Sequence, residues 1–133
     1  MASGACIVND GRKVMLNRAY KSTPDYSAIS KFAVGTGTTT PSVSDTALNS
    51  EITALGKMDF NSGYPVFDEN TQQVITQGFL SSVQGNGYTI TEVGEFNSDA
   101  TPKMFSRAVF TGINKNNTTE IIFQFTHKLK ATE

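Results

Sequence analysis

The sequence predicts a mainly β fold, a small antiparallel β-sandwich or partly rolled sheet of about five to seven strands with one short N-terminal helix. Segments rich in aromatic and β-branched residues recur along the chain, which favours half-buried strands. Turn-forming stretches separate them, such as QGNG at 84–87 and NKNNTT at 114–119. The segment TEIIFQFTHKLK, residues 119–130, alternates apolar and polar side chains over most of its length, as a strand with one buried face does.

Length and composition predict one soluble domain, residues 1–133. A chain of 133 residues buries roughly two thirds of the surface that its unfolded form exposes, so a core without cross-links is feasible. Residues 1–20 lack the pattern of a secretory signal, and no apolar run reaches the roughly 18 residues that span a bilayer. The single cysteine, Cys6, excludes an internal disulfide framework. We therefore expect synthesis in a reducing cytoplasm and no membrane partner.

A short helix is predicted before the first long strand. The segment NDGRKVMLNRAY, residues 9–20, is the only one of its length with helical character. Asn9 or Asp10 can cap the free amides at its start. The turn KSTPDY follows it. A broad apolar side is expected on this helix, formed by Val14, Met15, Leu16, Ala19 and Tyr20.

Strands are predicted for most of the remaining chain. SAISKFAVG, residues 27–35, is the first, with alternate side chains on opposite faces. TPSVSDTAL, residues 40–48, is expected to form a single helical turn begun by Ser44 or Asp45. The other predicted strands are EITALGKMDF (51–60), QQVITQGFLSS (72–82), YTITEVGEF (88–96) and KMFSRAVFTGI (103–113), with a long polar connection at NSGYPVFDEN (61–70).

Turn chemistry predicts two strand pairings. QGNG is expected to close a tight hairpin, because Asn86 and Gly87 tolerate the positive φ angles of primed turns. The last strand, 119–130, is expected to pair with 105–113 across the NKNNTT turn as a half-buried antiparallel pair. His127 then lies on the apolar face of this strand and is expected to be a packed or rim imidazole.

The loop GTGTTTPS, residues 35–42, does not fit a phosphate-binding motif. A Walker-type loop needs Gly-Lys-Ser/Thr after its second glycine, and a dinucleotide fingerprint needs a third glycine near residue 40. Here Thr40 and Pro41 stand there, and no long helix follows. We expect Gly35 and Gly37 to adopt backbone angles that only glycine tolerates, with the threonines hydrogen-bonding locally. No cofactor is predicted.

Catalytic and metal-binding patterns are not apparent in the sequence. His127 is the sole histidine and has no cysteine near it in the sequence, so no metal-ligand set is predicted. Glu92 and Glu95 are three apart on a predicted strand, which places their side chains on opposite faces. A structural role is expected instead, in which such a carboxylate accepts amide hydrogen bonds beside the backbone at Gly94. The net charge of −1 provides no basic surface for nucleic acid.

Three motifs resemble one family of virion proteins. FAVGTGTTTPSVSDTALNSEI (32–52) resembles the Gly-x-Gly, Pro, Ser/Thr-Asp-Thr-Ala-Leu run of short bacteriophage tail and baseplate proteins and of the N-terminal domains of tail-collar fibre proteins. YTITEVGEFN (88–97) resembles their Ile-x-Glu-Ile/Val-Gly-Leu-Phe strand, and IVNDGRKVMLNRAY (7–20) resembles their first helix. The resemblance spans nearly the whole chain in the expected order. One departure is Glu95, which replaces the family's leucine and is expected either to make the surface there more polar or to meet a different partner.

This resemblance implies a non-enzymatic structural protein of a phage tail, baseplate or fibre-attachment region. Such a protein is made and assembled in the cytoplasm of the host bacterium, joins other virion proteins, and forms a homo-oligomer in a symmetric assembly. The connection 61–70 and the loop from Gly35 to Asp45 are expected to be contact surfaces, the alternative being free solvent loops. Two other functions remain open: a capsid decoration or head-fibre attachment protein, and a carbohydrate-binding module. The expected loop contacts are Gly35, Thr36, Gly37, Thr38, Thr39, Thr40 and Asp45.

Overall fold

The computed structural model describes residues 4–129, and in that range it contains one helix and eight strands arranged as two antiparallel sheets. One sheet has five strands in the order β1-β7-β6-β2-β3, and the other has three in the order β4-β5-β8. The predicted class, mainly β with one short N-terminal helix, is confirmed. The elements are β1 (Gly4–Ile7), α1 (Asn9–Tyr20), β2 (Ile29–Gly35), β3 (Met58–Asp59), β4 (Val66–Asp68), β5 (Gln73–Leu80), β6 (Thr89–Asn97), β7 (Met104–Asn114) and β8 (Ile121–Lys128).

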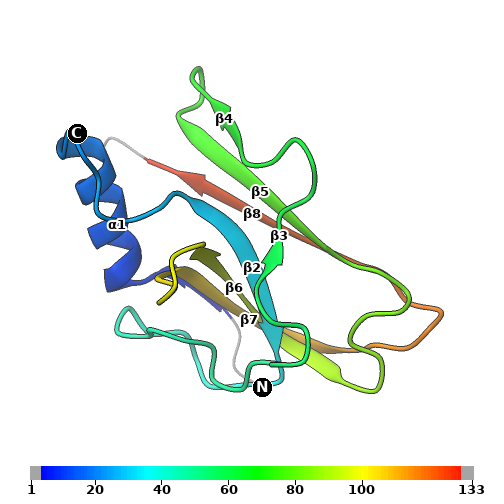
Figure 1. The fold of residues 1–133 in the computed structure, drawn as a ribbon. Coiled ribbons are helices and arrows are strands. Elements are labelled where there is room, and N and C mark those ends of the chain that lie inside the picture. Colours follow the sequence, from blue (N-terminus) through cyan, green and yellow to red (C-terminus); the bar gives the residue numbers. More distant parts are fainter. Residues whose placement is uncertain (1–3, 130–133) are drawn as a thin grey trace.

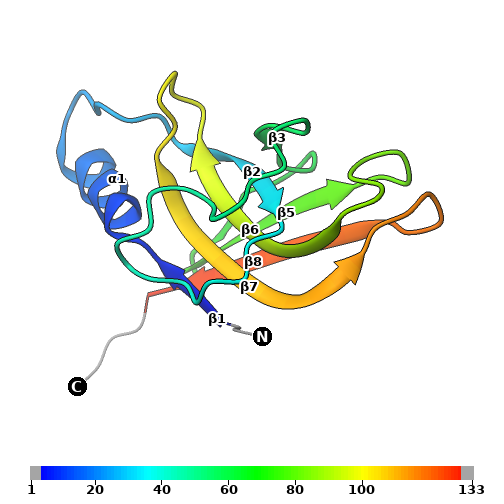
Figure 2. The same ribbon diagram turned by 90° about the horizontal axis from the view of Figure 1, so that it is seen from below.

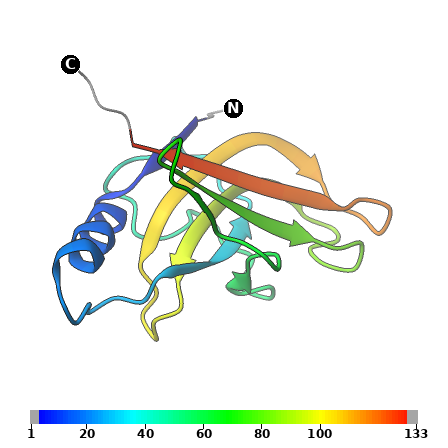
Figure 3. The ribbon, with the colours of Figure 1, turned by 90° about the horizontal axis from the view of Figure 1, so that it is seen from above.

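The two sheets face each other, and α1 lies at one end of the sandwich, against β7 (Figure 1). Figures 2 and 3 show that β7 curves strongly, so the fold is a partly rolled sandwich. The main core fills the space between the sheets, because both inner faces are apolar. Its buried residues are Phe32, Val34, Ile52, Leu80, Ile90, Val93, Ile121 and Phe123.

The centre of the larger sheet is buried on both faces. Phe32 and Val34 of β2 point into the main core, whereas Ala33 between them belongs to a second apolar cluster on the outer face. This explains why Phe-Ala-Val reads as a continuous apolar run and not as an alternation. The second cluster consists of Val8, Ala33, Leu48, Phe96 and Met104.

The helix forms where predicted, but its cap and its apolar side differ from the prediction. The N-cap is Val8, whose apolar side chain cannot make a capping bond, and the side-chain oxygen of Asn9 accepts a hydrogen bond from Arg12. Gly11 and Val14 are the buried residues of α1, whereas Leu16 and Tyr20 are 60% and 84% exposed. The helix therefore packs through one narrow contact, and the predicted broad apolar side is wrong.

The predicted pairing of the last two long strands is also wrong. β8 pairs with β5, from Leu80 opposite Ile121 to Gln73 opposite Lys128. β7 pairs with β6 and β1 in the other sheet. The NKNNTT turn therefore carries the chain from one sheet to the other, so the apolar faces of β7 and β8 meet across the core. The rings of Phe110 and Phe123, for example, have centroids 5.9 Å apart.

Several other segments also differ from the sequence-based expectation. QGNG joins β5 to β6, which lie in different sheets, so it is not a hairpin turn; Gly85 and Gly87 have φ of 68° and 90°. Most of the strand expected at 51–60 is irregular, with β3 at its end. The helical turn expected near Asp45 is a hydrogen-bonded turn closed by its amide on the carbonyl of Ser42. Two short strands were not predicted, namely β1 and β4.

Replacing Leu80 by alanine tests the position of the main core. Leu80 is fully buried between the sheets, so the cavity left behind should lower the free energy of unfolding by about 2–5 kcal/mol, measured by urea denaturation. Leu16→Ala is the matched control, because this leucine is mostly exposed on α1 and its loss should change stability by less than about 0.5 kcal/mol. Equal losses in the two variants would contradict the described core.

Candidate functional site

A buried carboxylate holds the glycine-threonine loop against the larger sheet. Glu92 lies in β6 and is 0% exposed. Its Oε2 accepts hydrogen bonds from the backbone amides of Gly37 (2.9 Å) and Ser50 (2.7 Å). Its Oε1 accepts from the amide of Asn49 (2.9 Å) and from Nε of Arg107 (2.9 Å). The Glu92 side chain thus joins Gly37 in the loop, residues 49–50 that follow the loop, and the neighbouring strand β7.

Arg107 extends this network to the far part of the loop. It lies on β7, is 1% exposed, and donates through Nη1 to Oδ2 of Asp45 at 3.1 Å. The same Asp45 oxygen accepts the amide of Ser42 at 2.9 Å and so closes the turn there. The resulting order Glu92–Arg107–Asp45 places a buried cation between two carboxylates. Losing Glu92 would leave the buried guanidinium with only Asp45, whose side chain is 24% exposed, and this loss is therefore costly.

Glycine is needed in this loop because of space, not because of backbone angle. The expectation of glycine-only backbone angles is wrong, since neither Gly35 nor Gly37 has a positive φ. A Cβ added to Gly37 would lie 2.5 Å from Oε2 of Glu92 and 2.5 Å from Cβ of Asn49. A Cβ on Gly35 would lie 2.5 Å from the same Oε2. The glycines therefore let the backbone approach the carboxylate closely.

Gly94 has a related role two residues further along β6. A Cβ there would lie 3.1 Å from Cδ2 of Leu48 and 3.1 Å from the carbonyl oxygen of Ser106. Leu48 belongs to the outer apolar cluster, in the segment that follows the loop. Gly94 thus lets this segment lie flat against the sheet. The amides that Glu92 binds belong to Gly37, Asn49 and Ser50 and not to the backbone beside Gly94.

The fixed loop presents a row of threonines to solvent. Thr36, Thr38, Thr39 and Thr40 are all exposed. Thr39 donates to Oδ1 of Asn49 at 3.2 Å, and the hydroxyl of Thr91 beneath the loop donates to the carbonyl of Gly37 at 2.8 Å. The backbone is therefore anchored from below, whereas the side chains above it are accessible. Of the predicted contact residues, the threonines lie on the surface, and Gly35, Gly37 and Asp45 hold the loop in place.

The second predicted contact segment, residues 61–70, lies elsewhere on the molecule and contains β4. Asn61 anchors it through two bonds to Gln77, from its amide to the carbonyl at 2.8 Å and between their side chains at 2.9 Å. Phe67 of β4 is 68% exposed. The structure does not join this segment to the threonine row, because β4 belongs to the smaller sheet.

Glu95 faces the interior between the sheets, on the side of β6 opposite Glu92. Its oxygens accept from the hydroxyls of Thr76 (2.6 Å) and Ser106 (2.5 Å). Nε2 of His127 lies 2.5 Å from Oε1, which links β8 to β6. The prediction that Glu92 and Glu95 face opposite ways is correct. The prediction that Glu95 makes the surface more polar is wrong, because this residue is 1% exposed.

His127 is packed as predicted, although its polar partner was not predicted. Its ring contacts Phe105 edge-on and stacks on Phe125, with centroid distances of 5.2 Å and 5.7 Å. The contact with Glu95 crosses from one sheet to the other, so no local spacing in the sequence reveals it. The apolar character of the strand around His127 was the only signal that it lies inward.

Other chemical groups in the described part of the chain are structural in character. Burial, together with the nearby Asp45 carboxylate, raises the pKa of the Cys6 thiol and so disfavours the reactive thiolate. Within residues 4–129, no three His, Cys, Asp or Glu side chains are grouped as a metal site requires. No helix described in this range is long and apolar enough to cross a membrane.

Comparisons of the chain with protein-family models, with curated proteins and with solved structures find no match. The assignment of a function therefore depends on the geometry of the loop and on the resemblance of its motifs.

Glu92→Gln tests the buried carboxylate. The substitution keeps the shape of the side chain but removes the charge that balances Arg107, so the free energy of unfolding should fall by about 3–5 kcal/mol in urea denaturation. Hydrogen exchange at the amides of Gly37, Asn49 and Ser50 should accelerate. Glu120→Gln is the control, since Glu120 is exposed and its change should be within about 0.5 kcal/mol. A stable variant with slow exchange at these amides would show that the charge is not required.

Gly37→Ala tests the close approach of the loop to Glu92. Because the added Cβ would lie within 3 Å of both Glu92 and Asn49, we expect a loss of about 1–3 kcal/mol by thermal or urea unfolding. The double variant Gly37→Ala with Glu92→Ala removes the obstructing side chain, so its loss should be smaller than the sum of the single losses. Additive losses would contradict a direct contact. Thr38→Ala serves as an exposed control in the same loop.

Proposed function

We propose that this chain is a non-enzymatic structural component of a bacteriophage virion, located in the tail, baseplate or tail-fibre attachment region. The observation that carries the proposal is the glycine-threonine loop held on the sheet by Glu92, in the segment whose motif resembles those virion proteins. In this proposal the loop is a rigid contact surface for neighbouring virion subunits.

The energetics of the loop support an assembly role. Loops that become ordered only on binding lose conformational entropy at that moment, which weakens the contact. Here three backbone amides and the Arg107–Asp45 pair fix the loop in the free subunit. A pre-ordered loop therefore avoids this entropy cost at each contact. In a symmetric assembly the same weak contact is repeated at every subunit, so the contributions add up.

The chemistry of the buried carboxylates is consistent with a structural protein. Glu92 is engaged by three amides and one guanidinium, and Glu95 by two hydroxyls and an imidazole. A general acid or base must reach the atom of a substrate whose proton it transfers. Neither side chain is accessible for that, because both are buried at the centre of β6. Partners of the proposed protein are other virion proteins and further copies of itself, assembled in the host cytoplasm.

Phage particles carrying loop variants test this function. Thr38→Lys combined with Thr40→Lys places charges on the exposed row and leaves Glu92 and the Thr39–Asn49 bond in place, so we expect the purified protein to keep its stability while its incorporation into particles falls at least about tenfold by quantitative immunoblot. Thr53→Lys, an exposed threonine outside the loop, is the matched control and should be incorporated normally.

Immunogold electron microscopy of the purified particles tests the location. Label on the tail, baseplate or fibre base is the expected result. Label confined to the capsid surface would overturn the tail assignment and favour a capsid decoration protein. Protein absent from particles altogether would overturn the virion assignment.

A further inference from the structure

The free edge of β8 borders an open apolar groove. β8 is eight residues long and pairs with β5 on one side; in the described part of the chain no strand pairs with its other side. All of its residues from Ile121 to Lys128 line a cavity of about 690 Å³. Since alternate residues point to opposite faces of a strand, a lining made of consecutive residues means that the strand edge itself faces the cavity.

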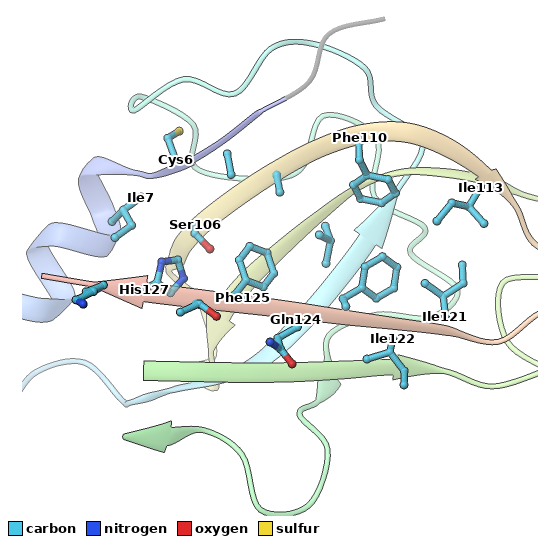
Figure 4. Close-up of a pocket in the computed structure, with 16 residues that line it drawn as sticks. Cys6, Ile7, Ser106, Phe110, Ile113, Ile121, Ile122, Gln124, Phe125 and His127 are labelled. Atoms are coloured by element: carbon cyan, nitrogen blue, oxygen red, sulfur yellow. The ribbon is translucent and has the colours of Figure 1, made fainter. Parts of the chain in front are cut away.

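The opposite side of the groove is formed by β7 and β1. β1 covers β7 only between Ser106 and Val109, so the rest of β7 has an uncovered side. Figure 4 shows Phe110 and Ile113 of β7 facing Phe125 and Ile121 of β8 across this space. The groove therefore has a largely apolar interior and is bordered along one side by the backbone edge of β8.

This edge lacks most of the features that normally prevent strand addition. Natural edge strands are protected by proline, bulges, shortness or charged side chains, especially lysine, and the one lysine of β8 is Lys128 at its end. β8 has no proline, and its eight pairs with β5 run without a register shift. Ile122 on its outer face is 62% exposed. A protein that leaves such an edge open exposes a site for β-augmentation, in which an added strand bonds to the backbone.

Charge at the groove is limited to one end. His127 and Lys128 lie at the C-terminal end of β8, and no Asp or Glu is among the described residues that line the cavity. Glu95 is buried behind His127 and is already bonded to it. Asp68 on β4 is in register with Lys128 across β5, but the two form no direct ion pair in the described structure. A hydrogen bond from Thr71 and, more weakly, the charge of Lys128 lower the pKa of Asp68. The groove thus complements a strand that is apolar on its inward side and acidic where it passes Lys128.

We propose that the groove between β8 and β7 binds an extended segment of a partner protein as an added strand next to β8, antiparallel to it. Apolar side chains of the segment, two residues apart, enter the cavity beside Phe123 and Phe125, and an acidic residue pairs with Lys128. This inference does not depend on the proposed virion role of the threonine loop, because the loop is held on the face of β6 that carries Glu92, whereas the groove lies beside β8 on the side of the smaller sheet.

A synthetic peptide tests the groove directly. The probe is an acetylated and amidated peptide as long as β8, with glutamate first and then valine or isoleucine alternating with threonine. We expect saturable binding by fluorescence anisotropy with a dissociation constant below about 1 mM. In hydrogen-exchange NMR, every second amide of β8 should gain protection, namely the amides that do not bond to β5. That alternation is the signature of strand addition and is not expected from adhesion to an apolar surface.

A charge exchange provides the specificity control. Lys128→Glu should weaken binding of the probe about two- to fivefold, the range of one exposed ion pair, and a probe beginning with lysine should recover it. Val83→Lys, on an exposed residue outside the cavity lining, should not alter binding.

Three results would overturn the proposal: no saturable binding, protection outside β8 and β7, or affinity that does not respond to the charge exchange. A dimer in sedimentation analysis of the free protein, with the β8 edge already protected, would also overturn it, by assigning the groove to a second copy.

Discussion

The carboxylate of Glu92 is the interaction on which the outer half of this structure depends. It provides acceptors for three loop amides and balances the buried Arg107, which in turn holds Asp45. A buried charge is costly unless it is paired and hydrogen-bonded, and here Nη2 of Arg107 remains buried without a hydrogen-bond partner. Because the partners come from distant parts of the chain, the loop, β6 and β7 must all be in place before the Glu92 carboxylate has its hydrogen-bond donors. The same requirement fixes glycine at positions 35 and 37, where any side chain would displace the carboxylate.

The two buried glutamates lie on opposite faces of β6 and join it to different parts of the structure. Glu92 joins the larger sheet to the loop outside it, and Glu95 joins the same sheet to the smaller one through Thr76 and His127. Apolar burial between the sheets supplies most of the driving force for folding but is not directional. The polar contacts are directional, since each donor must lie within bonding distance of one carboxylate oxygen. They specify how the loop and the second sheet are placed on a core that apolar contacts alone would leave less well defined.

The molecule presents two chemically different surfaces. The threonine row is polar, pre-ordered and supported from beneath by the Glu92 network. The groove beside β8 is apolar and bordered by an unpaired backbone edge. The first suits repeated contacts between folded subunits, whereas the second suits an extended chain that supplies its own backbone donors and acceptors. An adaptor within a larger assembly would use both, because it must join partners of different kinds.

The positions of α1 and of most long strands could be predicted from the sequence, because alternation, turn residues and helical propensity act over neighbouring residues. The opposite orientation of Glu92 and Glu95 followed from their spacing for the same reason. Strand pairing could not be predicted: β8 and β7 are joined by a short turn, yet only the packing of their apolar faces across the core decides that they lie in different sheets. The partners of Glu92 were likewise undetermined, since Gly37 is 55 residues away in the chain. Local patterns in the sequence established where most strands run and which side chains share a face. The tertiary structure decided which faces are buried and which charges and edges meet, because those contacts exist only once distant segments are brought together.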